Sequence, residues 1–116
     1  MTLGQPHEKP VYVRIREVIA EAILAGRYSD GDPLPSVRAL AIEQGANPLT
    51  VAKAYQGFQD EGLIVVRRGV GMFVAPNAEA RLRSSQRDAF ITTEWPEIRS
   101  RMARLGINPA DLMARA

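Results

Sequence analysis

The sequence contains no cysteine and a single histidine, His7, among its 116 residues. Without thiolates the chain has no disulfide framework, and one histidine near the N-terminus offers no cluster for a metal or a catalytic site. The chain also lacks a glycine-rich phosphate loop between a strand and a helix, and it shows no convergent set of acid, base and nucleophile. We therefore expect no metal, no cofactor and no enzymatic activity.

Long hydrophobic runs are absent as well. No window is apolar enough to span a bilayer, and the N-terminus lacks the positive start and continuous apolar stretch of a signal peptide. We therefore expect a cytoplasmic protein without a membrane partner. The hydrophobic content of 46% is that of a globular chain, and 116 residues suffice for one domain with a modest core and a short appendage.

The net charge of +2 is too small to indicate a nucleic-acid partner by itself. Residues 1–76 hold eight basic and eight acidic side chains, whereas residues 77–116 hold seven arginines and five acids. The larger, N-terminal part is therefore formally neutral. An argument for DNA binding has to rest on where the charges lie rather than on their sum.

Apolar spacing and helix-end signals divide the chain into three parts. Residues 1–9 are polar and predict a loose N-terminal arm. Residues 10–76 predict three helices and then a hairpin, because the apolar period changes from helical to strand-like after Gly62. The predicted elements are helices over residues 11–24, 37–44 and 48–61 and strands over residues 63–67 and 72–75.

Ser36 and Asn47 precede the second and third predicted helices as N-caps, and Gly45 suits the left-handed residue that ends the second helix. Two helices joined by a short turn that contains glycine form a helix-turn-helix. The hairpin, with Arg68-Gly69-Val70-Gly71 at its tip, would be the wing. The fold class is thus mainly α with a small β-hairpin wing: a winged helix-turn-helix domain at residues 10–76.

Residues 77–116 predict three further helices, at 78–92, 93–105 and 109–115, with Thr93 as the cap that follows an interruption at Trp95-Pro96. This tail has more apolar side chains than three short helices can bury against one another. We therefore expect a helical dimerisation tail that forms a homodimer; the alternative is a tail packed on its own winged domain. The expected contact residues are Leu82, Phe90, Ile91, Trp95, Ile98, Met102 and Leu105.

Four ordered segments carry a resemblance to a known family. In sequence order they are Leu34–Ala41, Asn47–Tyr55, Glu61–Ile64 and Arg68–Val74. Together they resemble the GntR family of bacterial regulators, and the end of the tail is similar to the YtrA subfamily, whose members lack a large effector domain. The resemblance implies a transcription regulator, most often a repressor, that binds double-stranded DNA at a palindromic operator as a homodimer. Genes of this subfamily commonly lie beside ABC-transporter genes, and the resemblance names no small-molecule effector.

Candidate DNA contacts fall on the two helices of the motif. The N-terminal half of the third helix enters a major groove in such motifs, and here it would present Asn47, Leu49, Thr50 and Lys53. The resemblance implies a DNA contact for Arg38 on the exposed side of the second helix. Relatives usually have a polar residue at the position of Leu49, and a leucine could touch only a thymine methyl group. The alternatives are that Asn47 is a cap alone and that Thr50 bonds a helix carbonyl.

Further candidates lie at the ends of this surface. Ser36 could bind a phosphate as well as cap its helix, and the hydroxyl of Tyr55 could reach a phosphate although its spacing is that of a core residue. Arg67 and Arg68 could reach phosphate or the minor groove from the wing, and Gly69 would let the backbone approach the duplex closely. The alternative function is a winged helix used for protein–protein contact, since a fold alone does not fix function.

Gly57 is unusual because it lies in the middle of the third predicted helix. Glycine there costs about 1 kcal/mol relative to alanine. Close packing against another helix would justify it.

Overall fold

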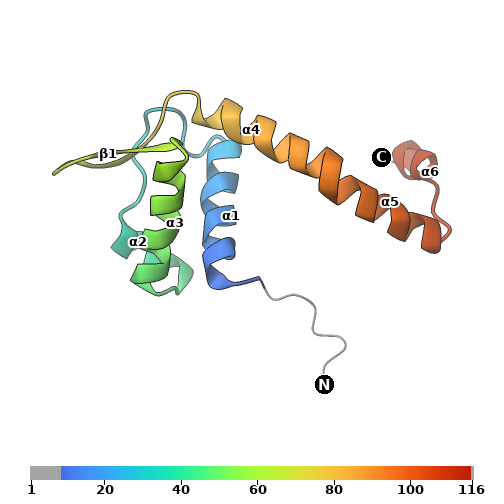
Figure 1. The fold of residues 1–116 in the computed structure, drawn as a ribbon, viewed down its shortest axis with the longest axis horizontal. Coiled ribbons are helices and arrows are strands. Elements are labelled where there is room, and N and C mark those ends of the chain that lie inside the picture. Colours follow the sequence, from blue (N-terminus) through green and yellow to red (C-terminus); the bar gives the residue numbers. More distant parts are fainter. Residues whose placement is uncertain (1–8, 116) are drawn as a thin grey trace, which may run out of the picture. The chain divides into compact units, whose positions relative to one another are not determined.

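The computed structural model describes residues 9–115, so the predicted N-terminal arm, His7 included, lies outside the described residues except for Lys9. The chain forms two compact units that divide after Leu82. We call them the winged unit, up to Leu82, and the tail unit, from Arg83. The elements, coloured along the chain in Figure 1, are α1 (Val11–Leu24), α2 (Val37–Gln44), α3 (Pro48–Asp60), β1 (Ile64–Arg67), β2 (Gly71–Val74), α4 (Ala78–Ala89), the π-helix η1 (Phe90–Glu94), α5 (Trp95–Arg104) and α6 (Pro109–Arg115).

The helix ends of the winged unit lie where the sequence predicts them. The Ser36 hydroxyl oxygen accepts a hydrogen bond from the backbone N–H of Ala39 at 3.0 Å, and the Asn47 side-chain oxygen accepts one from the N–H of Leu49 at 2.8 Å. Each bond satisfies an N–H that a helix start leaves without a partner. Gly45 ends α2 with a φ of 60°, in the left-handed region that favours glycine. The predicted caps are therefore confirmed.

The wing is a two-stranded antiparallel hairpin in which Ile64 pairs with Val74 and Arg67 with Gly71. The segment before α2 covers the outer edge of β2. There the N–H of Leu34 donates to the carbonyl of Met72 at 2.8 Å, and Pro33 forms an isolated bridge with Phe73. Because the edge is paired, its backbone groups are not open to another chain.

The core of the winged unit extends into α4. Ala78 and Leu82 are buried together with side chains of the three preceding helices and the hairpin, although we expected Leu82 in a dimer contact and a domain boundary after residue 76. Both expectations are wrong, because the first turn of α4 packs on the winged unit. The large buried side chains of this core are Ile15, Ile19, Ile23, Leu34, Leu40, Val51, Tyr55, Phe58, Leu63, Ile64, Val74 and Leu82.

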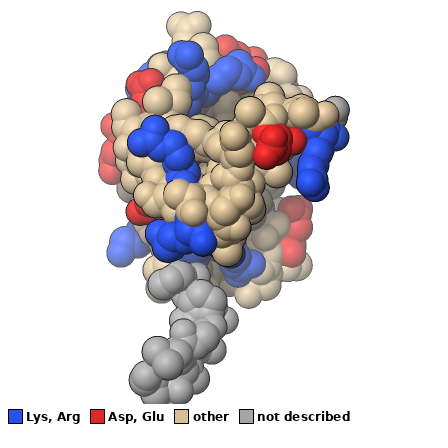
Figure 2. Space-filling view, turned by 90° about the vertical axis from the view of Figure 1, so that its right-hand side faces the viewer, with Lys and Arg blue, Asp and Glu red and all other residues tan. Residues whose placement is uncertain are grey.

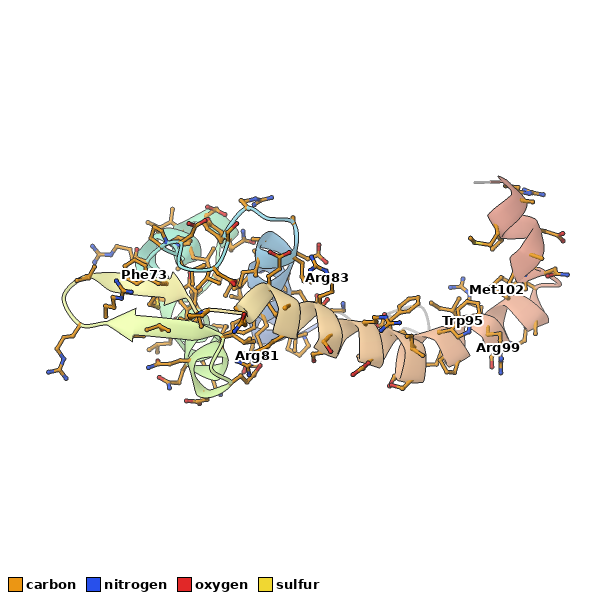
Figure 3. The ribbon with its side chains drawn as sticks, turned by 90° about the horizontal axis from the view of Figure 1, so that it is seen from above. Phe73, Arg81, Arg83, Trp95, Arg99 and Met102 are labelled. Atoms are coloured by element: carbon orange, nitrogen blue, oxygen red, sulfur yellow. The ribbon has the colours of Figure 1, made fainter. Side chains whose placement is uncertain are left out.

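Polar contacts fasten the same turn of α4. The Asp30 carboxylate accepts a hydrogen bond from the backbone N–H of Asn77 at 2.8 Å, just before the helix begins. The Arg81 guanidinium donates to the carbonyls of Glu61 at 2.7 Å and Gly62 at 3.1 Å, and Figure 3 shows Arg81 beside this end of α3. A cation is favourable there because the last carbonyls of a helix lack partners and carry negative partial charge.

Gly57 lies where α3 packs against α1. A Cβ at this position would lie 2.5 Å from an Nη atom of Arg16 and 3.1 Å from the Tyr12 hydroxyl. The Arg16 guanidinium lies 4.2 Å from the centre of the Phe58 ring and 2.7 Å from the Glu61 carboxylate. The close approach that would justify a mid-helix glycine is therefore present.

Helix runs without interruption from α4 through η1 into α5, so the predicted break before Thr93 is wrong. Pro96 has no N–H and its ring conflicts with the carbonyl four residues earlier. The chain accommodates it by widening one turn, in which the N–H of Trp95 donates to the carbonyl of Phe90, five residues back. Insertion of a π-turn keeps the helix going where a new start was expected.

Among the described residues of the tail unit, Met102 alone is buried. We predicted Met102 as a dimer contact, but it is covered by the tail unit itself, where the chain turns back and the N–H of Ile107 donates to its carbonyl at 2.9 Å. Trp95 is half-buried. Figure 2 shows acidic and basic side chains scattered over one face of the molecule, with uncharged surface around them. The large apolar side chains exposed in the tail unit are Phe90, Ile91, Ile98, Leu105, Ile107, Leu112 and Met113.

No helix in the described part of the chain is long and apolar enough to cross a membrane.

Candidate nucleic-acid interface

The first turn of α3 and the cap before it are open to solvent. Leu49 is 79% exposed, Asn47 and Lys53 are also exposed, and Thr50 is partly buried. The opposite side of α3 lies in the core and consists of the buried residues Val51, Ala54, Tyr55 and Phe58. The core therefore fixes which side of α3 faces outward.

The caps of α2 and α3 limit what two candidate residues can do. The side-chain oxygens of Ser36 and Asn47 accept the capping hydrogen bonds and are engaged within the chain. The amide NH₂ of Asn47 is a separate donor and lies on an exposed residue. Arg38 is exposed on α2, two residues after the Ser36 cap. The structure thus brings Arg38 and the start of α3 together in one motif, because α2 packs against α3.

Lys53 is exposed one turn after Leu49, and its ammonium lies 5.9 Å from the centre of the Tyr12 ring on α1. An ammonium within about 6 Å of an aromatic face is attracted by the ring. Tyr12 therefore restricts where this cation lies without removing it from solvent. No local pattern indicates this contact, because Tyr12 and Lys53 are far apart in the sequence.

Tyr55 does not lie on the exposed surface. Its side chain is buried, its hydroxyl donates to the carbonyl of Pro35 at 2.7 Å, and burial raises the pKa of the phenol well above its ordinary value. The prediction that this hydroxyl reaches a phosphate is wrong, since the group already bonds the segment that leads into α2. Tyr55 supports the motif from inside.

The wing presents Arg67, Arg68 and Gly69 at exposed positions. The Arg67 guanidinium lies 4.8 Å from the centre of the Phe73 ring on the opposite strand, and that ring is only partly buried. Figure 3 labels Phe73 on the wing. At the tip, Gly69 has a φ of 78°, a conformation that other residues rarely adopt. The hairpin therefore carries two adjacent cations on a tight turn.

Four supporting residues escaped the sequence analysis: Asp30, Arg81, Arg16 and Tyr12. Their partners lie many residues away, so no local pattern identifies them. Within residues 9–115 no three His, Cys, Asp or Glu side chains gather where they could hold a metal ion.

Comparison with known proteins agrees with this architecture. The chain is 44% identical over 73 residues to the HTH-type transcriptional repressor YtrA of Bacillus subtilis; the match covers 63% of this chain and 56% of that protein, so the chain spans just over half of its length. A solved GntR family transcriptional regulator from Listeria monocytogenes is 31% identical, with a TM-score of 0.73 and 92% of each chain covered. The DNA-binding domain of AraR, solved in complex with its operator ORR3, is 29% identical with a TM-score of 0.59, over 63% of this chain and 88% of that one.

These similarities confirm the predicted resemblance to the YtrA regulators and the winged-helix fold. The family model for bacterial regulatory proteins of the gntR family matches residues 11–74, more than half of the chain and nearly the whole winged unit. The protein therefore belongs to the gntR family of bacterial regulatory proteins.

Proposed function

We propose that the protein is a sequence-specific transcription regulator that represses by binding a palindromic operator in double-stranded DNA. The observation that carries the proposal is the exposed N-terminal half of α3, where the Asn47 cap, Leu49 and Lys53 are open on a helix whose other side is core. The N-terminal residues of a recognition helix are those that contact base edges. The N-terminus of α3 also carries positive partial charge, which favours a phosphate.

Four exposed cations lie on the helix-turn-helix and its wing. Arg38 on α2 and Lys53 on α3 would contact the backbone beside the major groove, and Arg67 with Arg68 would reach phosphate or the minor groove from the wing. The positions of these cations support DNA binding although the net charge of residues 1–76 is zero. The relative named as a repressor and the AraR domain solved on its operator support the proposal.

The test uses DNA fragments selected from a random pool by the full-length protein. Arg38→Ala and Lys53→Ala should each weaken binding to the selected site, and each lost phosphate contact should lower the log–log salt slope by about 1 per protomer. Arg14→Ala, which removes an exposed cation of α1, is the matched control and should leave the slope unchanged. If neither substitution weakens DNA binding, or if binding depends on neither salt nor sequence, the alternative function, a winged helix used for protein–protein contact, would be favoured.

We also propose that the tail unit forms the homodimer. Phe90, Ile91, Ile98 and Leu105 are 41 to 63% exposed, and such a concentration of apolar surface on a small unit usually marks an interface. A second copy is the natural occupant because a two-fold dimer matches two half-sites of a palindrome.

Charge along the helix supports an antiparallel arrangement of the two copies. Acids lie at the start of α5 (Glu94, just before it, and Glu97), and bases lie at its end (Arg101 and Arg104). A two-fold axis near Ile98 would set the acidic end of one helix against the basic end of the other. The contact would then be self-complementary, as a two-fold interface must be.

Charge reversal tests this arrangement. Glu94→Arg and Arg101→Glu should each weaken self-association in sedimentation experiments, and a mixture of the two variants should recover it as a heterodimer. Arg99→Glu, the matched reversal two residues from Arg101 and hence on another side of α5, should have little effect. A wild-type chain that is monomeric at micromolar concentration would refute the dimer. A mixture that fails to recover association would refute the antiparallel register.

A further inference from the structure

We infer that Leu49 selects thymine at one position of each half-site by contacting the thymine methyl group; this inference rests on the proposed DNA binding. Leu49 is 79% exposed, in the first turn of α3. Its backbone N–H is held by the Asn47 cap at 2.8 Å, so the start of the turn that carries the side chain is fixed.

The chemistry of the groove decides what such a side chain can recognise. A leucine neither donates nor accepts a hydrogen bond, and the only apolar group that base pairs present in the major groove is the C5-methyl of thymine. Over any other base edge, Leu49 would remove water from a donor or an acceptor without replacing the lost hydrogen bond, which is unfavourable. The same side chain therefore favours thymine and disfavours the other bases.

Two other apolar residues of the winged unit are similarly open but lie elsewhere in the motif. Ile42 is 76% exposed near the end of α2, the helix that crosses the backbone in such motifs rather than entering the groove. Val70 is 71% exposed at the wing tip, and a wing in the minor groove meets no thymine methyl. Leu49 alone of the three lies on the first turn of the recognition helix.

Uracil gives a direct test, because it lacks the methyl group of thymine and keeps every hydrogen-bonding atom. Each thymine of the selected operator is replaced by uracil in turn, and binding of the full-length protein is measured. Burial of one methyl is worth about fourfold in affinity. The wild-type protein should lose about fourfold at one position in one half-site, and about sixteenfold when both half-sites are changed.

Protein variants are then tested on the same thymine and uracil operators. Leu49→Ala should bind the thymine operator more weakly and should become insensitive to uracil at that position. Leu49→Asn should shift the preference there from thymine toward adenine, which asparagine contacts with two hydrogen bonds. Ile42→Ala is the matched control, an equally exposed residue, and should retain the uracil sensitivity of the wild type.

The outcomes separate this inference from the proposed function. Specific binding without loss at any uracil position overturns the thymine contact and leaves the proposed function standing. The same holds if Leu49→Ala keeps the wild-type sensitivity. A protein that selects no DNA sequence overturns both.

Discussion

The two units of the chain differ in how much they bury. In the winged unit, side chains from three helices, the hairpin and the first turn of α4 form one continuous core. In the tail unit, among the described residues, only Met102 is buried, and seven large apolar side chains remain exposed. A segment of this size is too small to stabilise itself by burial alone. The winged unit therefore has a core of its own, whereas the tail unit leaves most of its large apolar side chains exposed, which is the observation behind the proposed homodimer.

The largest effect should come from truncating matching phenylalanines in the two units. Phe58 is 1% exposed and Phe90 is 46% exposed. Phe58→Ala should lower the free energy of unfolding by about 3–5 kcal/mol because it leaves a cavity in a packed core. Phe90→Ala should leave the unfolding of dilute protein within about 0.5 kcal/mol and should instead weaken self-association. Urea unfolding measures the free energy of unfolding, and sedimentation measures self-association. If the two variants lost the same free energy of unfolding, the contrast between a buried core in the winged unit and an exposed apolar surface in the tail unit would be contradicted.

A smaller effect should follow from the Tyr55 hydroxyl. Tyr55→Phe leaves the Pro35 carbonyl without its donor and should cost about 1–2 kcal/mol. Burial raises the pKa of Tyr55 in the folded protein above its ordinary value of 10.0, so the unfolded chain releases the proton first. The stabilising contribution is therefore present below about pH 10 and is lost as the pH rises further.

This pH dependence sharpens the comparison, because Tyr55 is buried in the core of the winged unit. Alkaline unfolding should begin there, and Tyr55→Phe should make it shallower. Thermal unfolding at a series of pH values from neutral to strongly alkaline provides the measurement. An identical pH profile for the variant and the wild type would refute the assignment to Tyr55.

The smallest effect is expected at Gly57. Alanine there gains about 1 kcal/mol of helix propensity, but its Cβ displaces the Arg16 guanidinium from its contacts with Phe58 and Glu61. These contacts are partly solvated and each is worth under about 1 kcal/mol. The two terms should cancel to within about 0.5 kcal/mol in thermal unfolding. In an Arg16→Ala background Gly57→Ala should instead stabilise, and a loss of several kcal/mol in either background would show that the helices cannot adjust.

Sequence patterns predicted the winged unit well because its signals are local. Caps at Ser36 and Asn47, the glycine at the end of α2 and the change of apolar period at the hairpin each act within a few residues. The same patterns placed Arg38, Leu49 and Lys53 at exposed positions, where the structure has them.

Errors arose where distant contacts decide the structure. Leu82 has the spacing of a tail residue, but the place where its side chain packs is set by the core of the winged unit. Tyr55 was assigned a role at the surface because its partner, Pro35, lies 20 residues away. The π-turn before Pro96 was missed for another reason: a proline in a helical pattern is compatible with either a new start or a widened turn, and the local sequence does not distinguish them.

The fastening of α4 by Asp30 and Arg81 has a consequence for how members of this family can be recombined. A tail taken from a relative and joined at residue 76 would replace the turn that carries Arg81 and Leu82 with the relative's own first turn. A join after Leu82 keeps that turn with the unit that folds around it. The seam between the exchangeable parts thus lies inside a continuous helix rather than in the loop at Pro76-Asn77, where the sequence first suggested a cut.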